Sequence, residues 1–496
     1  MNAARPRHNP LDVIAYVGLL ALLLWLPLPW GSHRLWAAHL FVLLAGALLA
    51  LAGAGHALAH ETWRPPGRLY VAVGLWLFWL AWIAAQLAPL SAAWLERLSP
   101  AAAAIHASAG QAAGVAPAYT LSIAPGATFE AMLLSLGYFA LYLLAAFTAR
   151  DQGRRRGLML VLVISGLGQA VYGSLMTLSG AEYGFLIKKT YYLGYATGTF
   201  VNRNHLAAYL ELTAAAALGL VLADLKAESV RGWRQRLNAL IALALSTKLR
   251  VRVALAMMVV GLVLTRSRMG NAAFFAALLT VGLAQLLLRE RRLFFRAAIL
   301  FASLLLVDAM IVSHWFGLEK VIERIEATEV QTEKRTQVWD RLPPLIEAYP
   351  LTGSGLGTFA VAFPPFRTPD ITEYYDHAHN DYLEFLIETG PPGLVLLLML
   401  VLSHGVHAAQ TALRRRDRLV RGICFTYLMA GTALAIHATV EFNFQIPALA
   451  ATFTALMGLV VSCSDTPNPS RRRRVHETVD TAAGGEAESG ALPKPV

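Results

Sequence analysis

Cysteine and charged residues are both scarce in this chain of 496 residues. Its two cysteines, Cys424 and Cys463, lie in or at the end of apolar runs, which excludes a disulfide framework and a cysteine-based metal site. Charged residues make up 15% of the chain and hydrophobic residues 56%, so a soluble protein of this length would lack the charge to cover its surface. The composition therefore indicates a membrane protein.

The chain contains long apolar segments in place of charged ones. They recur from end to end at about 20 residues each, the length that a helix needs to cross roughly 30 Å of hydrocarbon. Continuous Leu, Ala and Val runs favour helices over a β-barrel, whose strands show shorter alternating segments. The first run, 11–30, has no small-residue cleavage site, so we predict a retained helix rather than a cleaved signal peptide.

Twelve of these segments are predicted to span the membrane. They are 11–30, 35–53, 69–88, 129–149, 157–178, 204–223, 253–267, 270–288, 296–313, 391–411, 420–440 and 445–463. With the N-terminus in the cytoplasm, the arginine clusters at 154–156, 289–292 and 414–416 all fall on the cytoplasmic side. The positive-inside rule then places both termini in the cytoplasm. This topology accounts for the net charge of +11 without a nucleic-acid partner.

Polar stretches divide the chain into regions. We predict helices one to nine in 1–313, with an Ala/Pro/Ser-rich outer loop at 89–128, a partly helical outer domain at 314–390, helices ten to twelve in 391–463, and a disordered cytoplasmic tail at 464–496. Residues 224–252 are basic and amphipathic and are expected on the cytoplasmic surface. The glycine-rich run 353–357 lacks the Lys-Ser/Thr ending of a phosphate loop, so we predict a tight turn.

The densest set of polar residues is 376–384, on the outer face just before a predicted span. His379 could act as a general base there, because histidine titrates near neutral pH and Asp381 or Glu384 could orient its ring. The alternative is an ordinary polar helix N-terminus capped by Asn380 or Asp381. The last outer turn, 441–445, is a weaker candidate for lining a cavity.

A metal site is a third possibility for the same segment. His377 and His379 lie close to several carboxylates, which is a donor set that transition metals accept. However, a His-x-His pair in an extended chain points its two rings to opposite sides. We therefore expect no metal.

Arginines at outer helix ends are the second candidate feature. Arg203 precedes the sixth predicted span, and Arg266 and Arg268 occupy the very short outer turn between the seventh and eighth. A charge at membrane depth costs at least a few kcal/mol and commonly marks a functional site. Arginine binds phosphate bidentately and stays charged. The alternative is that each side chain simply reaches outward to lipid headgroups.

Four sequence motifs resemble those of the O-antigen ligase and polymerase superfamily over about residues 195–460. They are Phe200-x-Asn202-Arg203-Asn204-His205, Ser267-Arg268-Met269-Gly270, Arg335-x-x-x-Trp339 followed by the stretch from Tyr349 to Phe359, and His379-Asn380-x-x-Leu383 continuing to Glu388-x-Gly390-x-x-Gly393. Met269 departs from the glycine that the family has at that position. The N-terminal third resembles the family only as generic membrane helices.

The resemblance implies a metal-independent, inverting glycosyltransferase of the GT-C type without a cofactor. Its donor would be a glycan on undecaprenyl diphosphate, and its acceptor lipid A-core in a ligase or another repeat unit in a polymerase. Arg203, Arg268 and Arg266 would bind the diphosphate, and His379 would be the general base, with His377 as the alternative base. Supporting roles would fall to Asn202, His205, Arg335, Asn380, Asp381 and Glu388. The enzyme would lie in the bacterial inner membrane with its site facing the periplasm.

The residues themselves do not name the acceptor, the sugar or the oligomeric state, and they favour ligase over polymerase only slightly. A rival from another class is a transporter or flippase for lipid-linked glycans with twelve spans. Such a protein is expected to show inverted repeats and interrupted helices at the membrane midplane. Neither is evident in this sequence, where the polar groups concentrate on the outer side.

Overall fold

The computed structural model describes residues 9–58, 66–224, 247–289, 337–369, 371 and 374–465. Its long helices are α1 (Pro10–Trp25), α2 (Leu35–Leu58), α3 (Gly67–Leu87), α6 (Pro125–Thr148), α7 (Gln152–Leu178), α8 (Arg203–Asp224), α10 (Thr247–Thr265), α11 (Arg268–Arg289), α16 (Asp381–Arg414), α17 (Arg418–His437) and α18 (Pro447–Ser462). Shorter elements are η1 (Trp30–Ser32), α4 (Ala92–Leu98), α5 (Pro100–Ala113), β1 (Tyr183–Gly184), β2 (Ile187–Lys188), α14 (Leu342–Ala348), α15 (Phe359–Ala362), η3 (Pro364–Phe366), η4 (Asn443–Gln445) and η5 (Cys463–Asp465).

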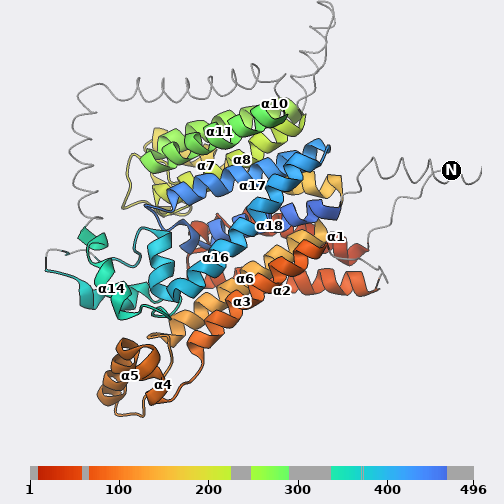
Figure 1. The fold of residues 1–496 in the computed structure, drawn as a ribbon. Coiled ribbons are helices and arrows are strands. Elements are labelled where there is room, and N and C mark those ends of the chain that lie inside the picture. Colours follow the sequence, from red (N-terminus) through yellow and green to blue (C-terminus); the bar gives the residue numbers. More distant parts are fainter. Residues whose placement is uncertain are drawn as a thin grey trace, which may run out of the picture.

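The long helices lie side by side in one bundle (Figure 1). Every predicted span that falls in the described part of the chain overlaps one of these helices, whereas 296–313 lies outside it. Seven of the described helices, α2, α3, α6, α7, α8, α16 and α17, are long and apolar enough to cross a membrane, and α1 and α18 are shorter apolar helices. The predominantly helical architecture is thereby confirmed for the described residues, while the number of twelve spans stays a prediction. Residues 225–246 and 466–496, which carry most of the predicted surface helix and the tail, also lie outside the described residues.

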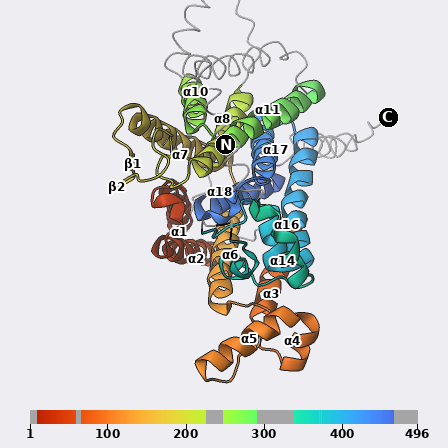
Figure 2. The ribbon, with the colours of Figure 1, turned by 90° about the vertical axis from the view of Figure 1, so that its left-hand side faces the viewer.

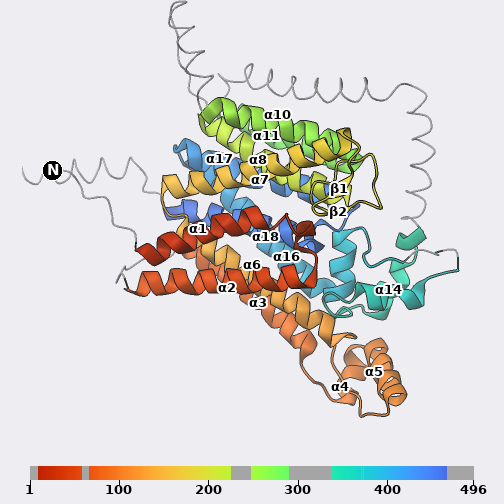
Figure 3. The ribbon, with the colours of Figure 1, turned by 180° about the vertical axis from the view of Figure 1, so that it is seen from behind.

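Several connections between the long helices lie together at one end of the bundle. There α7 ends and α8, α11 and α16 begin. The β1–β2 hairpin, α14 and the α4–α5 pair all lie at this end, which we call the site end (Figures 2 and 3).

Helix α8 forms the centre of the bundle, because every residue from Asn204 to Val221 is buried. It crosses α17 at two glycines. A Cβ added to Gly219 would lie 2.1 Å from the Thr426 hydroxyl oxygen and 2.5 Å from the Gly422 carbonyl oxygen. Small residues of this kind let two membrane helices approach backbone to backbone. The crossing lies toward the end of α8 that is remote from the site end, since α8 begins at Arg203 and ends at Asp224.

Replacing Gly219 with alanine is expected to destabilise the protein by roughly 1–3 kcal/mol, because the new methyl group must push α8 and α17 apart. Gly431→Ala on α17 is the matched control, since a Cβ there meets only Phe453 ring atoms at 3.7 and 3.8 Å. The unfolding temperatures of both variants in detergent are the measurement. Equal unfolding temperatures would mean that the close crossing is not needed.

The predicted outer loop 89–128 contains the helices α4 and α5, which the sequence-based prediction did not include. Its alanines favour a helix once the ends are defined, and Pro100 begins α5 while Gly114 ends it with a left-handed φ of 65°. Leu95, Ala102 and Ile123 share a separate apolar core with residues of the predicted outer domain, including Leu345 and Phe359. Residues of 89–128 and the described part of 337–378 therefore pack as one unit, which we call the outer unit.

The glycine-rich run 353–357 connects this unit to a break in α16, a contact that the prediction of a tight turn did not include. Gly390 interrupts the helix with φ 64° and ψ 178°. The Ile387 and Glu388 carbonyls freed by the break accept hydrogen bonds from the Ser354 and Gly355 amides, at 2.9 and 2.8 Å. A Cβ on Gly353 would lie 2.3 Å from the Glu388 carbonyl oxygen, so only glycine fits at this contact. The predicted boundary at 390/391 coincides with the kink.

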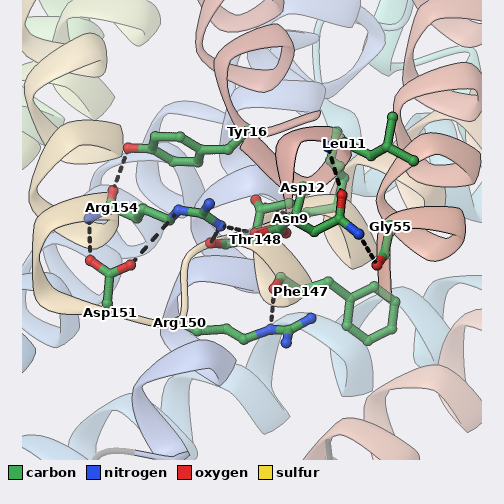
Figure 4. A network of polar contacts seen from close by, with 11 residues as sticks. Asn9, Leu11, Asp12, Tyr16, Gly55, Phe147, Thr148, Arg150, Asp151 and Arg154 are labelled. Carbon is green, nitrogen blue, oxygen red and sulfur yellow. Dashed lines mark hydrogen bonds and ion pairs between the residues drawn. The ribbon is translucent and has the colours of Figure 1, made fainter. Parts of the chain in front are cut away.

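The opposite end of the bundle is tied together by arginines at the start of α7 (Figure 4). Arg154 lies between Asp12, at 2.6 Å, and Asp151, and its own carbonyl accepts a hydrogen bond from the Tyr16 hydroxyl. Arg156 forms two hydrogen bonds with Asp224. Because α7 has 27 residues, these contacts lie about 40 Å from the site end. The arginine cluster thus links α1, α7 and α8.

Candidate active site

Two segments far apart in the sequence are joined where α16 begins. The Asn380 side chain donates a hydrogen bond to the Thr439 carbonyl at 2.9 Å, and its Oδ1 accepts one from the Leu383 amide, which caps α16. The Asp381 amide donates to the Ala438 carbonyl at 3.0 Å. The Asp381 carboxylate accepts a hydrogen bond from the Phe444 amide at 3.2 Å. Asn380 and Asp381 therefore fix the turn after α17 against the start of α16.

Phe442, in that turn, is surrounded by three histidine rings. His377 stacks on it at a centroid distance of 4.2 Å, and His379 and His205 meet it edge-on at 4.8 and 4.7 Å. His379 and His205 come from two different sequence motifs. The structure thus brings together the motif that begins α8 and the motif that begins α16.

Glu441 connects the same two motifs through its carboxylate. One oxygen accepts a hydrogen bond from the Asn204 side chain, and the other lies 3.4 Å from His379 Nδ1. The Glu441 side chain is 1% exposed, whereas that of His379 is 21% exposed. A buried carboxylate beside Nδ1 orients the ring and leaves Nε2 as the nitrogen for chemistry. The prediction that Asp381 or Glu384 orients the His379 ring is wrong, because both carboxylates have other contacts.

Glu384 pairs with His377 instead. Its Oε1 lies 2.6 Å from His377 Nδ1, and its Oε2 accepts a hydrogen bond from the Ala378 amide at 2.8 Å. Burial alone would lower the pKa of His377, but the charge and hydrogen bond of Glu384 outweigh it and raise that pKa to about 9. At neutral pH His377 is therefore a cation, and it has no lone pair with which to accept a proton.

Replacing Glu384 with glutamine is expected to flatten the dependence of stability on pH. Because the pKa of His377 is raised from 6.5 to about 9, its stabilisation is fully present below pH 6.5 and is lost as the pH rises through 9. The shift corresponds to on the order of 3 kcal/mol at most. We expect the unfolding temperature to fall less between about pH 6 and about pH 10 in Glu384→Gln than in the wild type or in Glu96→Gln, an exposed control on α4. A fall as large as that of the wild type would contradict the assignment.

Arg203 and Arg266 meet at one aromatic ring. Their guanidinium carbons lie 4.3 and 5.3 Å from the centre of the Tyr195 ring, and Arg203 also lies 5.9 Å from the Tyr192 ring. The Arg203 Nε is buried and has no hydrogen-bond partner among the described residues. Arg203, whose Nε–H has no partner among the described residues, and Arg266 beside the same ring form an arrangement suited to an anion.

The remaining predicted residues fall into different places. Asn202 Oδ1 accepts a hydrogen bond from the Asn204 amide at 2.9 Å, so it stabilises the start of α8. Glu388 accepts one from the Phe359 amide and supports the outer unit.

Arg268 begins α11 with an exposed side chain, and no contact within the described ranges joins it to Arg203. Arg335 lies outside the described residues. In the described ranges no three His, Cys, Asp or Glu side chains are grouped as a metal site would require.

The sequence-based prediction did not name Tyr195, and it included Glu441 only as part of the turn 441–445 that could line a cavity. A lone glutamate in the outer turn between two apolar segments was a visible signal for Glu441. The tyrosine-rich stretch 191–195, shortly before the first arginine motif, was a signal for Tyr195. Neither signal says which side chain it will meet.

Residues 253–398 match the protein family described as O-antigen ligase. The match contains the turn 267–270 and the His379-Asn380 pair, but it ends before Glu441 and begins after Arg203. It confirms the resemblance to the O-antigen ligase and polymerase superfamily. None of the curated proteins compared with the chain matches it.

Proposed function

We propose that the chain is a multi-pass membrane protein and an inverting glycosyltransferase of the O-antigen ligase and polymerase type, because a segment that matches the O-antigen ligase family lies within a bundle of apolar helices. It moves a glycan from undecaprenyl diphosphate to an acceptor hydroxyl at the periplasmic face of the bacterial inner membrane. The most favoured acceptor is lipid A-core. The reaction uses no cofactor.

The shared carboxylate of Glu441 carries this proposal. It contacts His379, the candidate base, and Asn204, which directly follows Arg203 in the chain. The candidate base therefore contacts this buried carboxylate directly. Arg203, a cation that could hold a diphosphate, is connected to it through the adjacent residue Asn204. Such an arrangement supports transfer chemistry, because the acceptor and the leaving group must be held in one geometry.

The reaction is a single displacement. His379 Nε2 takes the proton of the acceptor hydroxyl as its oxygen bonds to the anomeric carbon. The bond from that carbon to the diphosphate oxygen breaks, and its electron pair leaves with the diphosphate. Arg203 and Arg266 stabilise the charge that develops on the leaving oxygen. Glu441 stabilises the imidazolium that forms on His379.

His377 has a different role in this mechanism. Its pKa of about 9 keeps it protonated at neutral pH, so His379 is the better candidate for the base. As a cation stacked on Phe442, His377 adds positive potential beside the reacting groups.

Purified protein in proteoliposomes, supplied with a lipid-linked glycan and an acceptor, tests the proposal. We expect glycosylated acceptor to form without nucleotide and in the presence of a chelator. Movement of the lipid-linked glycan across the bilayer without any transfer would overturn the proposal in favour of a transporter.

A deletion strain distinguishes the ligase from its alternative, an O-antigen or exopolysaccharide polymerase. Loss of all polymer from lipid A-core, with lipid-linked polymer accumulating, is expected for the ligase. A single repeat unit left on the core would identify the polymerase instead.

A further inference from the structure

The hairpin between α7 and α8 presents apolar side chains to its surroundings. Leu186 at its tip is 77% exposed and Tyr191 is 75% exposed, and Ile187 and Leu193 are also more than half exposed. In the register of the strands, Tyr183 pairs with Lys188 and Gly184 with Ile187, which leaves Phe185 and Leu186 as the two-residue turn. A polar turn would be expected here if the hairpin faced water.

The fold holds this apolar tip outward instead of burying it. Lys189 forms a largely buried ion pair with Glu182 and donates a hydrogen bond to the Tyr195 carbonyl at 2.8 Å. Glu182 also accepts one from the Gly194 amide at 2.7 Å. The Tyr172 hydroxyl donates to the Phe185 carbonyl at 2.9 Å. These contacts brace the base of the hairpin, so the exposure of the tip belongs to the folded structure.

Lipid is the occupant that fits this surface. The hairpin joins α7 and α8, two helices that are long and apolar enough to cross a membrane, so its base lies where both helices leave the bilayer. Leu175 and Leu178 in the last turn of α7, a few positions before the hairpin, are also 57% and 54% exposed. Lys188 is exposed beside the apolar tip. Apolar side chains next to a basic residue are typical of segments that lie in the headgroup region.

We propose that residues 183–193 insert into the boundary between headgroups and acyl chains of the leaflet at the site end. The insertion fixes the depth of the tyrosines that follow. Because Lys189 bonds directly to the backbone of Tyr195, and Tyr195 contacts Arg203 and Arg266, the hairpin sets the height of both arginines above the acyl chains. A lipid-linked diphosphate would meet them at the level of the headgroups.

An environment-sensitive fluorophore measures the insertion without requiring activity. Leu186→Cys is labelled with nitrobenzoxadiazole in the full chain and reconstituted in vesicles of zwitterionic and anionic phospholipid. Val115→Cys, 63% exposed just after α5 in the outer unit, is the matched control. Cys424 and Cys463 are both buried, and the labelled parent protein gives their background.

We expect the label at position 186 to emit at shorter wavelength than the label at 115. It should be quenched by lipids that carry a spin label near the headgroup and be protected from aqueous iodide. Iodide quenching equal to that at position 115 would overturn the proposal. Protection that persists in lipid-free detergent and grows with protein concentration would also overturn it, because a second copy would then cover the hairpin.

A second variant tests whether the tip drives the insertion. With the label on Ile187→Cys, the added substitution Leu186→Asp is expected to raise iodide quenching to the level of the control, while Leu186→Phe leaves it low. Equal protection in both variants would overturn the proposal. The depth reading is independent of transfer, so it stands or falls separately from the glycosyltransferase assignment.

Discussion

Replacement of His379 with alanine is expected to lower the rate of transfer by roughly 10²–10⁴-fold, the usual contribution of a general base. The KM for the lipid-linked donor should change little, because in the proposed mechanism His379 acts on the acceptor hydroxyl. The measurement is the initial rate of acceptor glycosylation in proteoliposomes with both substrates varied. Transfer by His379→Ala at the wild-type rate would remove the base from the mechanism.

Glu441→Gln separates positioning from proton transfer. Its amide oxygen can still accept the hydrogen bond from Asn204, but the negative charge beside His379 Nδ1 is lost. We expect kcat to fall by less than in His379→Ala, with the KM for the donor unchanged. In the double variant with His379→Ala, no further loss is expected, since Glu441 acts through His379. A further loss as large as that of the single variant would show that Glu441 acts independently.

Replacement of Arg203 with alanine is the second large effect that we expect. Each charge-assisted hydrogen bond to the donor is worth roughly 1.5–3 kcal/mol, which corresponds to roughly 10- to 150-fold in kcat/KM for the donor. Arg203→Lys should recover part of this, because it keeps the charge but not the two-pronged contact. The KM for the acceptor should stay near its wild-type value.

Arg97→Ala is the matched control for this experiment. Arg97 lies over the Trp94 ring at 5.7 Å in the outer unit, so it has the same kind of arginine–aromatic contact at a distance from the site. Its removal should leave transfer unchanged. If Arg203→Ala behaves like Arg97→Ala with donor concentration varied, the arginine pair does not bind the diphosphate.

The helices could be predicted from sequence because an apolar run has to match the thickness of the bilayer, and this sets both its length and its composition. The outer helices α4 and α5 were missed for the opposite reason. Their alanines carry little hydrophobic signal, and they are stabilised by packing against residues near 345–363, more than two hundred positions away. Periodicity within one segment cannot report such a contact.

The site could be predicted only in part for a similar reason. Asp381 and Glu384 were expected to orient His379 because they are close to it in sequence. In the structure Asp381 accepts a hydrogen bond from the Phe444 amide, and Glu384 pairs with His377. The carboxylate beside His379 comes from Glu441, 62 positions further along. Motifs identified the histidine and the arginine, whereas the group that connects them depends on how α17 ends.

The dependence on the turn after α17 has a consequence for exchanging acceptor preference between related proteins. A chimera that receives only a foreign segment 337–381 would bring a new His379 to a resident Glu441 and Phe442. The transplanted histidine would then contact a carboxylate and an aromatic ring that in the recipient protein pack against a different segment. Residues 438–445 have to be transplanted together with segment 337–381, because the surroundings of His379 are built from two separate parts of the sequence.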